Sequence, residues 1–113
     1  MSPLIRLAIV VNSIWGRSVA VGSDQRRQER RPLVAAVVPP ADLEAALDLL
    51  AIGDLAWHDC YGPSQLAIAA TVLDDILLLC DGNLSRMIRL TRGAIRDFRD
   101  LRVAADERRR HPR

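Results

Sequence analysis

The chain has little of several residue types, and each shortage excludes a class of protein. Lysine is absent, so all 16 cations among the 113 residues are arginine. The two cysteines, Cys60 and Cys80, are too few and too far apart for a disulfide framework. Aromatic residues make up 4% of the sequence, which provides no stacking platform for single-stranded nucleic acid. No stretch reaches the roughly 18 consecutive apolar residues that a membrane span requires.

Short motifs that carry chemistry are also missing. The sequence contains no glycine-rich phosphate loop, nucleophile elbow, metalloprotease motif or calcium loop. We therefore expect no catalytic residue, no metal and no cofactor. The apolar run at residues 4–15 resembles a signal peptide, but Arg6 and Asn12 interrupt it and no basic residue precedes it. We expect a cytoplasmic protein of one domain that makes no contact with a membrane.

Charge is sorted along the chain into three parts. Residues 41–82 carry eight carboxylates and no arginine, whereas residues 83–113 carry ten arginines and four carboxylates. The first forty residues add six arginines and two carboxylates, so the net charge of +2 conceals the asymmetry. Such sorting indicates that one part of the molecule faces another part, or faces a charged partner.

The first forty residues differ in character from the rest. Apolar runs rich in β-branched residues, typical of strands, occupy residues 4–11 and 33–38, and a weaker one occupies 18–21. Residues 22–31 read as an exposed loop or flexible arm. We therefore predict a strand-like or irregular N-terminal arm over residues 1–40, followed by a helical domain over 41–113. An internal start at Val34, Val37 or Val38 is the alternative, in which case the preceding residues do not belong to the folded protein.

Helical periodicity dominates the rest of the sequence. Leucines and Trp57 recur on one face after Pro39-Pro40, which predicts a helix near 41–58, and Gly53 either ends this helix or only weakens it. Between residues 66 and 80 the polar residues are Thr71, Asp74 and Asp75, so a helix over 64–81 should be the most buried one.

The last predicted helix, over residues 83–109, is the clearest amphipathic pattern in the chain. Gly82 and Asn83 suit a helix end and a helix start, which joins this helix to the previous one as an antiparallel hairpin. Gly93, at the rim of its apolar face, either costs stability or permits close helix packing. The fold class is therefore mainly α, a small helical bundle with a C-terminal hairpin.

Two clusters in the acidic part could carry chemistry. His58, Asp59 and Cys60 have the side chains of a nucleophile or metal site, but adjacent residues point in different directions, so a hinge packed by aromatic residues is favoured. Asp74 and Asp75 could serve as acid and base or bind a cation. We favour pairing of these carboxylates with an arginine, either across the helical hairpin or across a dimer interface.

The basic residues near the C-terminus form the strongest candidate for a binding surface. It comprises Arg89, Arg92, Arg96, Arg99, Arg108, Arg109 and Arg110. Some of these arginines have carboxylates four residues away, as Arg96 has Asp100, which is also typical of a solvated face. We expect a small non-enzymatic interaction or regulatory protein, a homodimer, that contacts an acidic protein. Nucleic-acid binding through the same face is the alternative, and a small enzyme or metal site around residues 58–60 is the second alternative.

Overall fold

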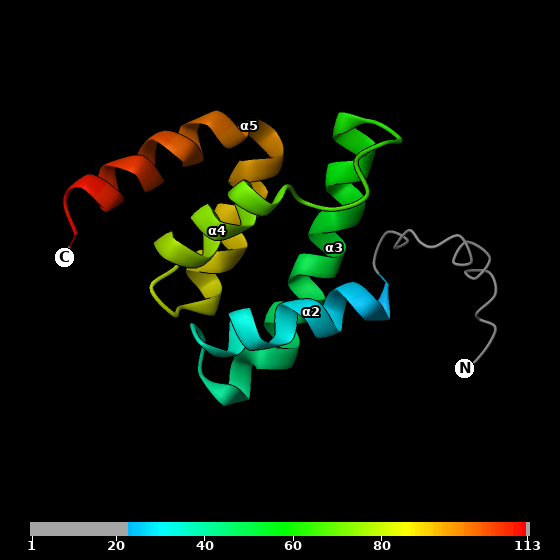
Figure 1. Cartoon of the computed structure of the whole chain (residues 1–113), viewed down its shortest axis with the longest axis horizontal. Coiled ribbons are helices and arrows are strands. Elements are labelled where there is room, and N and C mark those ends of the chain that lie inside the picture. Colours follow the sequence, from blue (N-terminus) through cyan, green and yellow to red (C-terminus); the bar gives the residue numbers. More distant parts are fainter. Residues whose placement is uncertain (1–22, 113) are drawn as a thin grey trace.

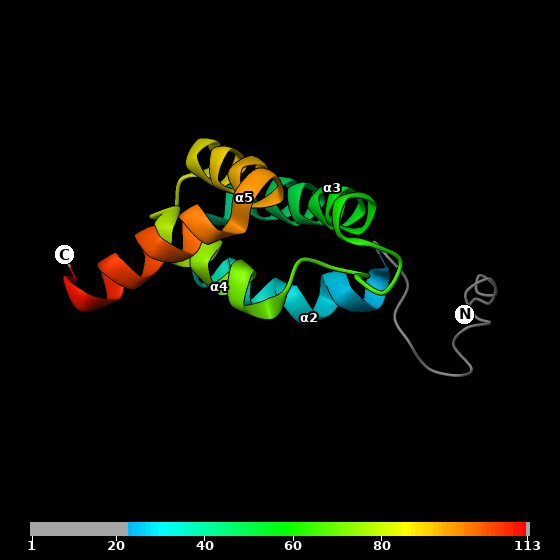
Figure 2. The ribbon, with the colours of Figure 1, turned by 90° about the horizontal axis from the view of Figure 1, so that it is seen from above.

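The computed structural model describes residues 23–112, and these form a bundle of four α-helices. Figure 1 shows α2 (Asp24–Ala35), α3 (Leu43–Tyr61), α4 (Ala70–Leu79) and α5 (Leu84–Arg110), and the 3-10 helix η1 (Pro40–Asp42) precedes α3. In Figure 2, α3 and the first half of α5 lie in one layer, and α2 and α4 lie in the other. The predicted mainly α fold is confirmed, and no strand occurs within residues 23–112.

Helix α2 covers residues 24–35, in the region for which a loop over 22–31 and a strand over 33–38 were predicted. Ser23 starts it, since its hydroxyl accepts a hydrogen bond from the Arg26 amide at 3.1 Å. The valines that suggested a strand instead serve the core of the bundle, where Val34 is completely buried and Val38 is 4% exposed. Residues from Asp24 onward therefore belong to the fold, whereas the strands predicted for 4–11 and 18–21 lie outside the described residues.

A buried ion pair fixes α2 on α3. Arg30 of α2 donates two hydrogen bonds, of 2.7 and 2.8 Å, to the two carboxylate oxygens of Asp54 in α3. Both side chains are buried, and the Ile68 amide also donates to Asp54 Oδ1 at 2.9 Å. One carboxylate thus connects α2, α3 and the segment that leads from α3 to α4.

That connecting segment is not helical, so the helix predicted from residue 64 begins only at Ala70. Several of its polar groups bond to α3: the Gln65 side chain accepts from the Trp57 indole at 3.2 Å, and the Gln65 carbonyl lies 2.9 Å from His58 Nδ1. These hydrogen bonds, together with that from the Ile68 amide to Asp54, pair polar groups of the segment in the absence of intrahelical hydrogen bonds. Apolar periodicity alone does not reveal such long-range partners.

Helix α3 runs unbroken through Gly53, where three segments approach one another. A Cβ atom at Gly53 would lie 3.0 Å from Ile68 Cδ1 and 3.1 Å from Thr91 Cγ2, so glycine permits the close contact with α5. At Gly93, by contrast, a Cβ atom would meet no described atom within 4 Å. Gly93 therefore has no packing role in the bundle and only lowers helix propensity.

The predicted hairpin is present, but its second helix is bent. Helices α4 and α5 are joined by a turn in which Gly82 has a φ of 73° and Asn83 caps α5 by accepting from the Arg86 amide at 2.8 Å. The expected straight helix over 83–109 is interrupted at Asp97, whose φ of −160° and ψ of 95° are non-helical. The first half of α5 lies beside α3, and the second half folds back along α4 (Figure 1).

The two glycines of α3 and α5 should respond oppositely to an added side chain. We expect Gly93→Ala to raise the free energy of unfolding by up to about 1 kcal/mol, because alanine is the better helix former. Gly53→Val should lower it by about 1–3 kcal/mol, because its methyl groups would overpack the contact with Ile68 and Thr91. Urea unfolding measures both, and a loss of stability in Gly93→Ala would contradict the packing described for α5.

Acid should weaken the outer contact between α2 and α3. Arg31 and Arg27 bind Glu44 and lower the pKa of its carboxyl from 4.5 to about 2. The unfolded chain therefore takes up the proton more readily than the folded one, so this contribution is complete above pH 4.5 and is lost as the pH falls to about 2.

We expect the stability difference between wild type and Glu44→Gln, measured by urea unfolding, to shrink over that pH range. The control is Asp59→Asn, which removes an exposed carboxylate from the same helix. A difference that stays constant from pH 6 to pH 2 would show that Glu44 is not held ionised by these arginines.

Candidate functional site

The seven arginines predicted as a binding surface fall into two groups. Arg89, Arg92 and Arg96 are exposed, and within residues 23–112 none of them forms an ion pair or a side-chain hydrogen bond. The other four are engaged inside the chain, with the following partners: Asp97 for Arg99, Asp81 for Arg108, Asp75 for Arg109 and Glu107 for Arg110. Of the seven, therefore, Arg89, Arg92 and Arg96 in the first half of α5 have available guanidinium groups, whereas Arg86 of the same half is paired with Asp81.

Asp75 connects α4 to the second half of α5. Its side chain is completely buried, and Oδ1 accepts a hydrogen bond of 2.8 Å from Arg109 Nη2, which raises the pKa of that arginine. Oδ2 lies 3.9 Å from Arg102 Nε and makes no hydrogen bond to another described residue. The predicted pairing of this acidic edge with an arginine of the last helix is therefore confirmed for Asp75, whereas Asp74 is exposed.

The side chains of Asp97, at the bend, and of Tyr61, in α3, satisfy two backbone groups that the bend leaves without a helical partner. In a continuous helix the Arg99 amide would donate to the Ile95 carbonyl. Here the Arg99 amide donates to Asp97 Oδ1 at 3.0 Å, and the Tyr61 hydroxyl donates to the Ile95 carbonyl at 2.9 Å. The amide hydrogen bond, followed by the Arg99 guanidinium, lowers the pKa of Asp97. Each half of the missing helical hydrogen bond therefore has its own partner.

An aromatic cluster holds the bend against the end of α3. The ring centroid of Trp57 lies 4.4 Å from that of Tyr61 and 5.7 Å from that of Phe98, which is the first residue after Asp97. Tyr61 and Phe98 meet nearly edge to face at 5.8 Å, a favourable arrangement for aromatic rings. Residues 57–61, predicted as a hinge, are instead the helical end of α3, and their aromatic rings contact the bend in α5.

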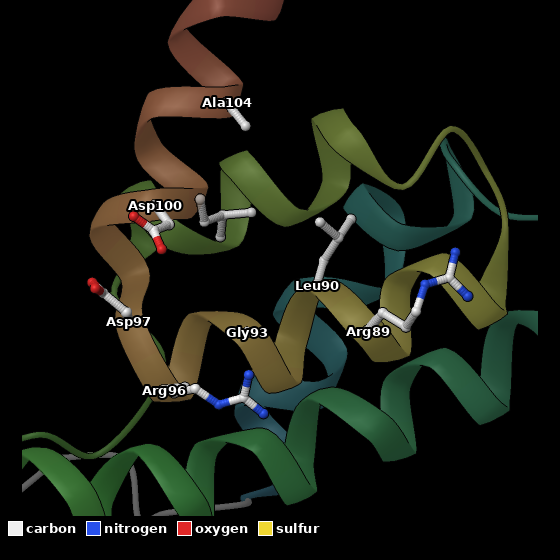
Figure 3. Close-up of a pocket in the computed structure, with 8 residues that line it drawn as sticks. Arg89, Leu90, Gly93, Arg96, Asp97, Asp100 and Ala104 are labelled. Atoms are coloured by element: carbon white, nitrogen blue, oxygen red, sulfur yellow. The ribbon is translucent and has the colours of Figure 1, made fainter.

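A small pocket lies between the two halves of α5, at the bend. Its volume is about 290 Å³, and it is lined by the following residues of α5 alone: Arg89, Leu90, Gly93, Arg96, Asp97, Asp100, Leu101 and Ala104. Figure 3 shows Arg89 and Arg96 on the first half of the helix and Asp100 on the second. The bend also separates Arg96 from Asp100, so the ion pair expected from their spacing does not form in the described part of the chain. The volume is at the lower end of those of small-molecule sites, about 300–1,000 Å³.

The structure does not bring the second predicted cluster together as a site. His58, Asp59 and Cys60 occupy successive positions in the last turn of α3, so their side chains point in different directions. Cys80 is buried elsewhere, with its thiol 3.5 Å from the Leu77 carbonyl. No group of three or more metal-ligating side chains occurs among residues 23–112. Chemistry at these three residues remains a prediction without geometric support.

Comparison of the chain with protein-family models, curated proteins and solved structures gives no match. Within the part of the chain that the structure describes, no helix is long and apolar enough to cross a membrane.

Proposed function

We propose that this chain is a small non-enzymatic interaction protein that binds an acidic protein partner through Arg89, Arg92 and Arg96. The observation that carries the proposal is the division of the arginines, since these three lack an ion-pair partner within residues 23–112 while the other four of the surface are paired. An arginine without an internal partner keeps its planar set of donors for a carboxylate of another molecule.

The three arginines have the spacing of a binding face. They stand at i, i+3 and i+7 in the first half of α5, which puts them on one side of the helix over about 10 Å. A partner helix with carboxylates at the same spacing would match them. This half of α5 packs closely on α3 at Gly53, and a face fixed in this way binds at a lower entropy cost.

An exposed apolar side chain beside the arginines favours a protein partner over nucleic acid. Ile88 precedes Arg92 by one helical turn and is 38% exposed. Protein interfaces combine apolar contacts with arginine, whereas a phosphate backbone offers nothing for Ile88 to pack against. The nucleic-acid alternative is also weakened by the pairing of the C-terminal arginines, because fewer guanidinium groups remain to release counterions.

A binding titration with three probes separates the two functions. The probes are a labelled acidic polypeptide of poly-glutamate, a DNA duplex and a DNA single strand, each at 50 and 200 mM salt. The test variant is Arg89→Gln/Arg92→Gln/Arg96→Gln. The control variant Arg99→Gln/Arg102→Gln/Arg110→Gln removes the same charge from the second half of α5, where each arginine already has an acidic neighbour.

We expect the acidic polypeptide to bind wild type and the control variant, and to bind the test variant at least ten times more weakly. Duplex binding that is stronger than polypeptide binding would favour the alternative. With three phosphate contacts it should weaken about 40-fold between the two salt concentrations, and with seven by about 10³-fold or more. No binding of any probe at 50 mM salt would overturn the assignment of this face.

A further inference from the structure

The break in α5 is confined to a single residue. Inside the helix, the non-helical backbone angles belong to Asp97, and its φ of −160° is an extended conformation that any residue can adopt. Residues 84–96 and 98–110 are helical on either side. A change at one residue would therefore join the two halves into a continuous helix.

The buried residues of both halves lie in phase across the break. Met87, Thr91 and Ala94 are buried before it, and Leu101 and Ala105 are buried after it. At 100° per residue all five would fall within about 80° of one another on a straight helix. An extended residue in the middle of a helix changes the angular positions of the residues that follow it. The bent form therefore does not require the buried residues of the two halves to share one face of a straight helix. The sequence is therefore compatible with a straight amphipathic helix as well as with the bent one.

Few contacts distinguish the bent form from the straight one at the break itself. The bend is held by hydrogen bonds from the Arg99 amide and the Arg99 guanidinium to Asp97, by that from Tyr61 to the Ile95 carbonyl and by the packing of Phe98. Straightening would replace the hydrogen bonds of the Arg99 amide and the Ile95 carbonyl by the helical one between these two groups. The two forms thus exchange one set of satisfied backbone groups for another.

A straight α5 would uncover a surface on α4 that residues 98–110 of a second copy fit. In the bent form the second half of α5 covers the buried carboxylate of Asp75 with Arg109 and contacts Asp81 through Arg108 at 2.9 Å. Once that half moves away, Asp75 is left without its ion pair, which is costly for a carboxylate in an apolar surface. The same segment of a second copy carries both arginines and the apolar residues Leu101 and Ala105 at the right spacing.

We propose that this chain forms a dimer by exchange of the second half of α5, in which α5 straightens at Asp97 and residues 98–110 dock on α4 of a second copy. Each copy both gives and receives the segment, so the dimer is closed and symmetric. All contacts between residues 98–110 and α4 are retained, now between two chains. The proposal does not depend on the partner of Arg89, Arg92 and Arg96.

The first test changes the residue at the break. Asp97→Ala removes the carboxylate that caps the second half and supplies a strong helix former, so it should favour the straight helix. Asp97→Asn keeps a capping side chain, and Asp100→Ala removes an equal charge three residues away. Light scattering after size-exclusion chromatography gives the mass of each from micromolar to millimolar concentration. We expect Asp97→Ala to have twice the monomer mass of 12.5 kDa at concentrations at least tenfold below those at which wild type and both controls dimerise.

The second test asks whether the dimer is the exchanged one. Asp75→Arg and Arg109→Asp each place like charges together within one chain, whereas exchange between the two variants restores an opposite-charge pair at both contacts. The two variants are refolded together from urea and compared with each refolded alone, so the test works even where neither folds by itself. We expect a folded heterodimer from the mixture. An Asp97→Ala protein that remains monomeric at millimolar concentration, or a mixture that gives no heterodimer, would overturn the proposal.

Discussion

The buried carboxylate of Asp54 is the point on which the arrangement of the helices depends. It lies in the middle of α3 and accepts hydrogen bonds from Arg30 of α2 and from the Ile68 amide ahead of α4. A buried carboxylate must keep its partners, because removing one leaves an uncompensated charge that costs several kcal/mol. The ion pairs of Arg27 and Arg31 with Glu44 reinforce the same helix contact, but their acidic partner is exposed, and they cannot replace the buried pair.

The position of α3 in turn decides which arginines are available for binding. Tyr61 at the end of α3 bonds to the Ile95 carbonyl, and Trp57 packs on Phe98, so α5 bends where it meets the end of α3. The bend directs the second half of α5 onto α4, where Asp75 binds Arg109. Before the bend, Arg86 pairs with Asp81, whereas Arg89, Arg92 and Arg96 have no such partner in the described structure. The binding surface is thus a consequence of packing some distance away from it.

Sequence reasoning located the features that local pattern determines. The apolar spacing placed α3 and the hairpin, the Gly82-Asn83 turn followed from its capping residues, and the narrow polar edge at Asp75 predicted an arginine partner. It missed features that depend on distant residues. Arg30 lies in a run of arginines that was predicted to be exposed, because no neighbouring residue in the sequence indicates its ion pair with Asp54. The break at Asp97 left a weak signal, an aspartate with a good capping side chain in the middle of a helical pattern.

A comparison of two arginines on α2 tests the central role of Asp54 most directly. Arg30 and Arg27 lie one helical turn apart and both bind carboxylates of α3, but the partner of Arg30 is buried and the partners of Arg27 are exposed. We expect Arg30→Met to lower the free energy of unfolding in urea by about 3–5 kcal/mol, because Asp54 is left buried without its cation. Arg27→Met should lower the free energy of unfolding by only a small fraction of that amount. Equal losses in the two variants would contradict the account, since the fold would then not depend on the buried carboxylate.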